Sequence, residues 1–228
     1  MTDTYSQFAT EVKACTACKL CETRLNVVVD RGNPNADLAI IGEAPDAYED
    51  KIGECSVGAE GKFINDTVAR AGLDDFVIFN ILKCRPPGNL FPGHPDSTAP
   101  LRSVLKCLPH FDRQFDLIKP KVVLLAGLKA VEWTIYRDRR PVPAFDDLVH
   151  KWFRSEDYKD VDFLTVYSPN HILRTRSVDL AKHEDMVAQT DKILRWAKEL
   201  LGGVTPRAAV EHLKRSGRRE PPVQGRLF

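Results

Sequence analysis

Short apolar segments alternate with longer amphipathic ones along this chain, and this alternation constrains its fold more than any other feature. The short segments are rich in Val, Ile, Leu and Phe, as buried strands are. They comprise Asn26–Val29, Leu38–Ile41, Phe76–Leu82, Lys121–Ala126 and Phe163–Tyr167. Apolar residues recurring every three or four positions predict helices over Gly61–Ala71, Ala99–Ile118, Leu128–Ile135 and Leu180–Leu201. Strands that alternate with helices favour an α/β fold with a parallel sheet covered on both faces.

The size and composition of the chain fit one soluble domain. Of its 228 residues, 43% are hydrophobic and 29% are charged, which is ordinary for a globular protein of this length. We assign residues 1–203 to this domain and residues 204–228 to a short helix followed by a basic C-terminal tail. The formal net charge is +1, so a nucleic-acid partner has to be inferred from local residues rather than from the total charge.

The sequence predicts neither export nor membrane insertion. Met1–Ser6 lack the basic stretch and apolar run of a secretory signal. The longest apolar run, about Val122–Leu128, is far shorter than the roughly 20 residues of a membrane-spanning helix. We therefore expect a cytoplasmic monomer with no membrane partner.

Three loops are the places to look for a functional site. Ligands of parallel α/β sheets bind at the carboxyl ends of the strands. The loops that follow predicted strands and are rich in Gly, Pro, Asn and charged residues are Gly42–Gly61, Lys83–Ser97 and Ser168–Ser177. We expect the chemistry of this protein to reside in these loops.

The six cysteines favour metal or redox chemistry over disulfides if the compartment is reducing. Cys15 and Cys18 form a CxxC pair, Cys84 follows a predicted strand and Cys107 lies in a predicted helix. Such a set completes a four-thiolate site for zinc or for a [4Fe–4S] cluster. The alternative is a redox pair with two small buried hydrophobic residues. Counting thiols does not separate zinc from iron–sulfur.

Two loop motifs carry a specific resemblance. The first contains 42–45 (Gly-Glu-Ala-Pro), Glu49-Asp50, Gly53, Val57-Gly58 and Gly61; the second contains 80–87 (Asn-Ile-Leu-Lys-Cys-Arg-Pro-Pro) and Asn89. Weaker matches are Cys15-Thr16-Ala17-Cys18, Gly32-Asn33-Pro34 and Leu173-Arg174 after Ser168-Pro169. In combination these motifs resemble those of family 4 uracil-DNA glycosylases, from about Cys15 to Trp196.

The resemblance implies a fold, a cofactor and an activity. The implied fold is a three-layer α/β/α sandwich with a central four-stranded parallel sheet. The implied cofactor is a [4Fe–4S] cluster on Cys15, Cys18, Cys84 and Cys107, with Cys21 as the substitute to test because 92–99 lengthens the gap before Cys107. The implied activity is excision of uracil or a related base from DNA by hydrolysis of the N-glycosidic bond, in base-excision repair.

A glycosylase must hold a flipped base in a pocket and stabilise the charges that develop as the bond breaks. Asn80 stands where the family reads uracil, and its amide offers both a donor and an acceptor; the alternative is a cap for the following turn. Glu43 and Glu49 are the candidate catalytic carboxylates, although Glu49 also fits a solvated loop acid. The predicted base pocket comprises Gly42, Ala44, Asp46, Ser56, Asn80 and Ser168.

Charged and apolar residues beside the site are candidate DNA contacts. We expect Lys83, Arg85 and Arg174 to contact the DNA backbone. Ile172 or Leu173 is a candidate wedge that fills the gap left by the flipped base, with core packing as the alternative.

Three pocket positions depart from the family pattern. Asp46 replaces Gly, Ser56 replaces an aromatic residue that stacks on the base, and Ser168 replaces a His that donates to the base. Stacking contributes roughly 1–3 kcal/mol and a preorganised donor roughly 2.7–4 kcal/mol. One interpretation is excision of a modified base such as a 5-substituted pyrimidine; another is a DNA-binding iron–sulfur protein that has lost excision. A third, weaker one is a zinc-bound nucleotide-binding protein.

The chain ends in Gln224-Gly225-Arg226-Leu227-Phe228. This segment resembles the short peptides with which bacterial repair proteins bind the sliding clamp. Leu227 and Phe228 would anchor in an apolar pocket while Gln224 makes polar contacts. The alternative is a tail without a partner.

Overall fold

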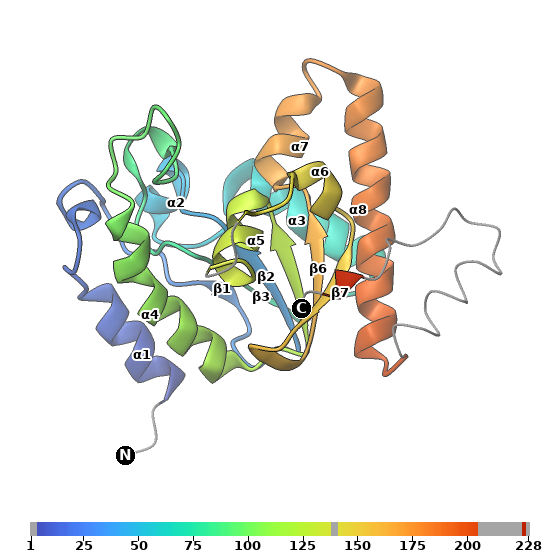
Figure 1. Ribbon diagram of the computed structural model, residues 1–228, viewed down its shortest axis with the longest axis horizontal. Coiled ribbons are helices and arrows are strands. Elements are labelled where there is room, and N and C mark those ends of the chain that lie inside the picture. The colour runs from blue at the N-terminus through green and yellow to red at the C-terminus, as the bar shows by residue number, and fades with distance from the viewer. Residues whose placement is uncertain (1–3, 138–140, 205–224, 227–228) are drawn as a thin grey trace.

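The computed structural model describes residues 4–137, 141–204 and 225–226, which fold around one twisted sheet (Figure 1). The strand order is β1-β3-β2-β4-β6-β5-β7. The strands are β1 (Arg31–Gly32), β2 (Leu38–Gly42), β3 (Val77–Asn80), β4 (Val122–Ala126), β5 (Trp152–Ser155), β6 (Tyr158–Val166) and β7 (Gly225–Arg226). The predicted short helix after residue 204 lies outside the described residues, as do Gln224, Leu227 and Phe228.

The predicted four-stranded parallel sheet is the centre of a wider, mixed sheet. Strands β3, β2, β4 and β6 are parallel to their neighbours. Two pairings outside this centre are antiparallel, β1 with β3 and β5 with β6, and β7 lies parallel to β5 at the edge. The β5–β6 pair is antiparallel because a tight turn joins two consecutive strands. The α/β class is confirmed, but the sheet has more strands than expected.

One predicted strand is wrong. Residues 26–29 form no strand, and the edge strand β1 comes later, at 31–32. The backbone N–H of Val28 donates to the carbonyl of Lys83 at 2.8 Å, outside the regular ladder. A short apolar run therefore marked a buried connection rather than a strand.

Helices cover both faces of the sheet, as the sequence predicts. One face carries α1 (Tyr5–Lys13), α4 (Arg102–Ile118) and α5 (Leu128–Thr134); the other carries α3 (Gly58–Ala71) and α8 (Leu180–Leu201). Shorter elements are α2 (Ala47–Ile52), α6 (Phe145–Leu148), α7 (Pro169–Thr175) and two 3₁₀ helices, Lys19–Glu22 and Pro87–Asn89. Alternate residues of β2 enter opposite cores: Ala39 and Ile41 join one, Leu38 and Ile40 the other.

Local capping signals start two of the helices that the periodicity missed, α1 and α7. Thr4 and Gln7 form a capping box at the start of α1. The Ser168 hydroxyl oxygen accepts the backbone N–H of His171, and Pro169 occupies the first turn of α7. Each helix is short, so its apolar periodicity is weak while its cap is clear.

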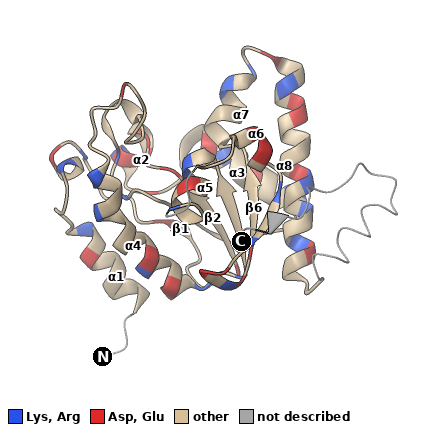
Figure 2. Cartoon of the chain, viewed as in Figure 1, with Lys and Arg blue, Asp and Glu red and all other residues tan. Residues whose placement is uncertain are grey.

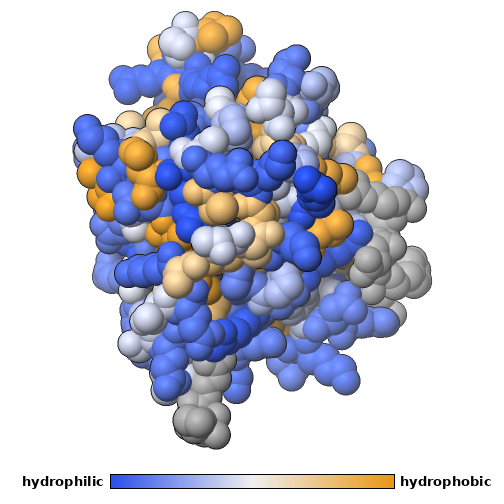
Figure 3. Space-filling model, turned by 90° about the vertical axis from the view of Figure 1, so that its left-hand side faces the viewer, coloured by the Kyte–Doolittle hydropathy of each residue, from blue (hydrophilic) through white to orange (hydrophobic). Residues whose placement is uncertain are grey.

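The surface is mixed in charge and hydropathy. Lys and Arg alternate with Asp and Glu along α4 and α8 (Figure 2). On the face that carries α1 and α4, hydrophobic residues form small separate groups among hydrophilic ones (Figure 3). Among the described residues, no helix is both long and apolar enough to cross a membrane.

Candidate functional site

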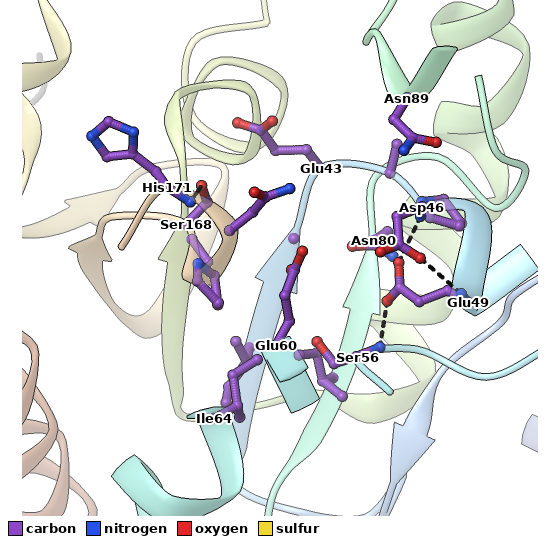
Figure 4. Close-up of a pocket in the computed structure, with 18 of the residues that line it drawn as sticks. Glu43, Asp46, Glu49, Ser56, Glu60, Ile64, Asn80, Asn89, Ser168 and His171 are labelled. Atoms are coloured by element: carbon purple, nitrogen blue, oxygen red, sulfur yellow. Dashed lines mark hydrogen bonds between the residues drawn. The ribbon is translucent and has the colours of Figure 1, made fainter. Parts of the chain in front are cut away.

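A cavity of about 270 Å³ opens at the carboxyl ends of the parallel strands (Figure 4). Gly42 ends β2, Asn80 ends β3 and Ala126 ends β4, while Ser168 follows β6, and all four line the cavity. Each of the three predicted loops contributes to the wall. The cavity therefore lies where the sequence predicts a site, at the edge of the sheet where strand ends meet.

Asn80 forms part of the cavity floor and is 6% exposed. Its side-chain amide donates to the Sγ of Cys55 at 3.7 Å rather than capping the turn after β3. A Cβ on Gly42 would lie 2.2 Å from Asn80 Oδ1, so only glycine at this position leaves room for the amide. This close approach explains why the paired strand ends carry Gly and Asn.

Glu43 is fixed at the start of α5. Its Oε1 accepts the backbone N–H of Lys129 at 2.9 Å. Gly127, with φ +103°, allows this contact, because a Cβ there would lie 2.5 Å from Glu43 Oε1. Burial is the main cause that raises the pKa of Glu43, which the Lys129 amide partly offsets. The side chain lines the cavity with its carboxyl group preorganised.

Asp46 and Glu49 build the wall of the cavity through a capping box. The Asp46 carboxylate accepts the N–H groups of Tyr48 and Glu49 at 2.7 and 2.8 Å. Glu49 Oε2 accepts the N–H of Asp46 at 2.8 Å, and its Oε1 accepts the N–H of Ser56. Asp46 therefore starts α2. Both oxygens of Glu49 are engaged by backbone amides, which points to a positioning role rather than the catalytic role expected from the sequence.

The backbone of Ser56 packs closely against α3. It has φ +49° and is 9% exposed. Its carbonyl oxygen lies so close to α3 that a Cβ on Gly61 would come within 1.7 Å of it. The loop that replaces an aromatic residue with serine is thus tightly packed against the helix behind it.

Gly61→Ala is expected to destabilise the protein, because the new methyl group meets backbone atoms that cannot rotate away. Overpacking of this kind costs about 1–3 kcal/mol, which lowers the thermal midpoint of a domain of this size by roughly 2–12 °C. Circular dichroism at a fixed heating rate measures the midpoint. Ala59→Ser, at an exposed neighbour, is the matched control; an equal midpoint for Gly61→Ala and this control would contradict the expectation.

Glu60, which the sequence reasoning missed, also lines the cavity. It lies in the first turn of α3, and its side chain points into the cavity in Figure 4. Burial, followed by the negative charges of Glu49, Asp46 and Glu43, raises its pKa to about 7. An acidic residue in a helical pattern is usually solvated, so the sequence carried no signal for this position.

Helix α7 supplies the opposite wall. Ser168 faces the cavity while its hydroxyl oxygen accepts the His171 N–H at 3.3 Å. The imidazole of His171 is directed away from the cavity interior (Figure 4) and packs near Tyr167. Arg174 is exposed and lines the cavity mouth. In this arrangement the His171 ring is not presented to the cavity interior.

Two predicted DNA contacts are wrong. Ile172 is fully buried beneath α7, so it packs in the protein interior and is not a wedge. Lys83 is 1% exposed: its ammonium group donates to the Asn80 carbonyl oxygen at 2.6 Å and to the Gln114 side chain. Leu173 and Arg85 are partly exposed, and Arg85 donates to the Asn89 side chain at 2.6 Å.

Phe91 contributes an aromatic ring to the cavity from a position that the sequence analysis did not predict. It is the only Phe, Tyr or Trp among the described residues that line the cavity, and it comes from the loop after β3. It is 7% exposed and joins the core next to α4. The cavity therefore has an aromatic wall even though Ser56 supplies none.

The four predicted cysteine ligands line a second, small cavity between the N-terminal segment, the loop after β3 and α4. Its lining includes Cys15, Cys18, Cys84 and Cys107 but not Cys21. Cys21 instead lies near the carbonyl oxygen of Thr16, at 3.9 Å. The structure brings together the expected set without the substitute.

Donors surround these sulfur atoms. Arg24 donates to Cys84 Sγ at 3.1 Å and the Lys83 backbone N–H to Cys107 Sγ at 3.3 Å, while His110 Nε2 lies 3.3 Å from Cys15 Sγ. No group of three His, Cys, Asp or Glu side chains in the described chain is placed to hold a single metal ion. A [4Fe–4S] cluster takes one thiolate on each of four irons, so its ligands need not converge on one point.

Comparison with known proteins decides the family. A family model described as the uracil DNA glycosylase superfamily matches residues 29–195, which include the large cavity and strands β1 to β6. The chain belongs to the uracil-DNA glycosylase superfamily. The matched region carries Glu43, Asn80 and two of the four clustered cysteines, so the family assignment and the geometry concern the same part of the chain.

Relatives within the superfamily are named type-4 uracil-DNA glycosylases. The protein of Sulfurisphaera tokodaii is 37% identical over 134 residues, 58% of this chain and 58% of that protein. The protein of Archaeoglobus fulgidus is 32% identical over 72% of this chain and 80% of its own length. For Thermotoga maritima the identity is 29%, over 75% and 84%.

Proposed function

We propose that this chain is a DNA glycosylase that excises uracil or a related modified base by hydrolysing the N-glycosidic bond. The observation that carries the proposal is the cavity where β2 and β3 end, with the Asn80 amide in its floor and the Glu43 carboxylate in its wall. Membership of the superfamily supports DNA as the substrate, and the names of the relatives make uracil the first base to test.

Asn80 is the proposed reader of the base. An amide offers a donor and an acceptor side by side, which complements the adjacent carbonyl and N–H groups of a pyrimidine edge. Its burial excludes much of the competing water, and the absence of a side chain on Gly42 leaves room for its oxygen. A buried amide left without its partner is costly, so a base lacking the matching groups is disfavoured.

Glu43 is the proposed catalytic carboxylate. Cleavage of the bond places positive charge on the sugar and negative charge on the leaving base. A fixed carboxylate stabilises the sugar cation and accepts a proton from the attacking water. The Lys129 amide and Gly127 hold Glu43 in place, so its orientation need not change during the reaction. The proposed DNA contacts that remain are Arg174 at the mouth, Leu173 and Arg85.

Base release from oligonucleotides tests the proposal. Duplex and single-stranded oligonucleotides carry uracil, 5-hydroxymethyluracil or hypoxanthine, and alkaline cleavage reveals each abasic site. We expect release of at least one of these bases. Release of none, with DNA binding intact, would instead favour a DNA-binding protein without excision. Ser56 and Ser168 are the observation that favours this second candidate, because they stand where the family pattern has a stacking aromatic residue and a donating histidine.

We further propose that Cys15, Cys18, Cys84 and Cys107 hold a [4Fe–4S] cluster. The residues present fit such a group: four cysteines line one cavity, and N–H donors from Arg24 and Lys83 face their sulfur atoms. Hydrogen bonds to sulfur and partial burial are the means by which proteins tune such clusters. When bound, the cluster would link the N-terminal segment to the loop after β3 and to α4.

Cys107→Ser is expected to remove most of the iron from protein prepared without oxygen, because it deletes one of four ligands. Cys21→Ser is the matched control: Cys21 lies only six residues from Cys15, yet it does not line the cavity. Iron and acid-labile sulfide per protein chain are measured for both variants. Loss of iron in Cys21→Ser with retention in Cys107→Ser would reverse the ligand assignment.

A further inference from the structure

Four carboxyl groups line the large cavity. Among the residues that the structure describes, Glu60 is the one of these four that makes no hydrogen bond. The other three carboxylates accept backbone N–H groups: Glu43 from α5, and Asp46 and Glu49 from the α2 capping box. Glu60 projects from the first turn of α3 into the space between Ser168 and Asn80 (Figure 4). It is therefore placed to meet a ligand rather than to support a loop.

The charged groups around Glu60 are mostly negative. Glu43 faces the same cavity from the end of β2, and Asp46 and Glu49 face it from α2. From α7, His171 turns its ring away and Arg174 stands exposed at the mouth. A fourth negative charge in this space is unfavourable, since burial and three like charges all oppose it. These causes raise the pKa of Glu60 to about 7.

The charge of the leaving base also favours a neutral carboxyl group at Glu60. A pyrimidine released by cleavage of its N-glycosidic bond departs as an anion, and an ionised carboxylate in contact with it would repel it. A neutral carboxyl group has the opposite effect, because its O–H donates to the oxygen on which negative charge develops. Some enzymes keep a carboxylic acid neutral near pH 7 for this purpose. A DNA strand closing over the cavity removes further water and favours the neutral form more strongly.

We propose that Glu60 is a base-contacting, specificity-determining residue whose neutral carboxyl group donates a hydrogen bond to a carbonyl oxygen of the flipped base. The inference rests on the proposed function and adds a second reader opposite Asn80. It also selects a substrate class: bases that present a carbonyl oxygen at this position, as uracil does, over bases that present an amino group there. Glu60 thus supplies a donor from α3 in a cavity where Ser168 stands in place of the histidine of the family pattern.

Binding to a base that cannot be released tests this directly. The probes are two oligonucleotides that differ at one position, where one carries 2′-fluoro-2′-deoxyuridine and the other an abasic analogue. The ratio of their affinities isolates the contribution of the base. For the wild-type protein we expect this ratio to fall about tenfold as the pH rises through about 7 and the donor is lost. Glu60→Gln, which donates at every pH, should keep the ratio high without this decline.

Two further variants complete the test. Glu60→Ala should lower the ratio at all pH values to the wild-type level at high pH. Glu54→Gln, at an exposed position in the preceding loop, should retain the wild-type profile. A ratio that rises with pH, or a decline that persists in full in Glu60→Gln, would overturn the proposal. Absence of base release in the excision assay would instead overturn the proposed function, and the affinity ratio would still report on Glu60.

Discussion

Glu43→Gln is expected to slow base release by about 10²- to 10⁴-fold, the range that a positioned acid–base group contributes. Glutamine keeps the shape of the side chain, and its Oε1 can still accept the Lys129 N–H that holds Glu43. What it lacks is the negative charge that stabilises the sugar cation and the basicity that activates water. The loss should therefore appear in kcat, with KM little changed. Single-turnover kinetics on a uracil oligonucleotide measure it.

The pH dependence gives this expectation a second readout. Burial raises the pKa of Glu43, and the ionised form is the one proposed to act. The wild-type rate should therefore fall as the pH drops through that raised pKa, and Glu43→Gln should lack this acid limb. Glu184→Gln, an exposed residue of α8, serves as the control. A Glu43→Gln rate equal to the control rate would exclude Glu43 from the chemistry.

Asn80→Ala should reduce kcat/KM for uracil by about 10²- to 10³-fold, the effect of removing one preorganised polar group from a water-excluded site. The substitution deletes the amide that faces the base and leaves the backbone carbonyl that accepts from Lys83. Steady-state kinetics on the uracil oligonucleotide give the loss. Affinity for an oligonucleotide with an abasic analogue should be unchanged, because the phosphate contacts remain.

The matched control for Asn80 is Asn35→Ala, an exposed amide far from the cavity. Asn80→Asp tests whether residue 80 recognises the base, since an ionised carboxylate accepts a hydrogen bond but does not donate one. It should lower the preference for uracil over cytosine even where some activity persists. An Asn80→Ala enzyme as fast as the Asn35→Ala enzyme would remove Asn80 from the proposed reading role.

The sequence predicted correctly that the site lies at the carboxyl ends of the strands. Asn80 and Glu43 follow apolar runs, and the carboxyl ends of parallel strands meet at one edge of a sheet whatever the details of packing. The side-chain environments were harder to foresee. Lys83 is buried against α4, which is distant in sequence, and Ile172 is the buried residue of α7, a short helix without a periodic signal. Burial of a single side chain is a tertiary property that no local pattern encodes.

The missed elements have physical reasons of the same kind. Strands β1 and β5 are short and carry few of the alternating apolar residues that mark a strand. The spacing of Asp46 and Glu49 is that of a capping box, whereas the resemblance predicted Asp46 only as a pocket residue. Glu60 faces the cavity only because Gly61 lets α3 approach the Ser56 carbonyl group.

Asn80 and Cys84 stand four positions apart, and Lys83 between them makes contacts in both directions. Its ammonium group donates to the carbonyl of Asn80, and its backbone N–H donates to the sulfur of Cys107. This arrangement limits how the protein can diverge. A substitution between Asn80 and Cys84 that changes base preference also affects the segment that carries the cysteines. Base preference and the cysteine site are therefore expected to change together. Variation is less constrained on the facing wall, where the Ser56 and Glu60 side chains carry no such tie, and redesign of base choice is best begun there.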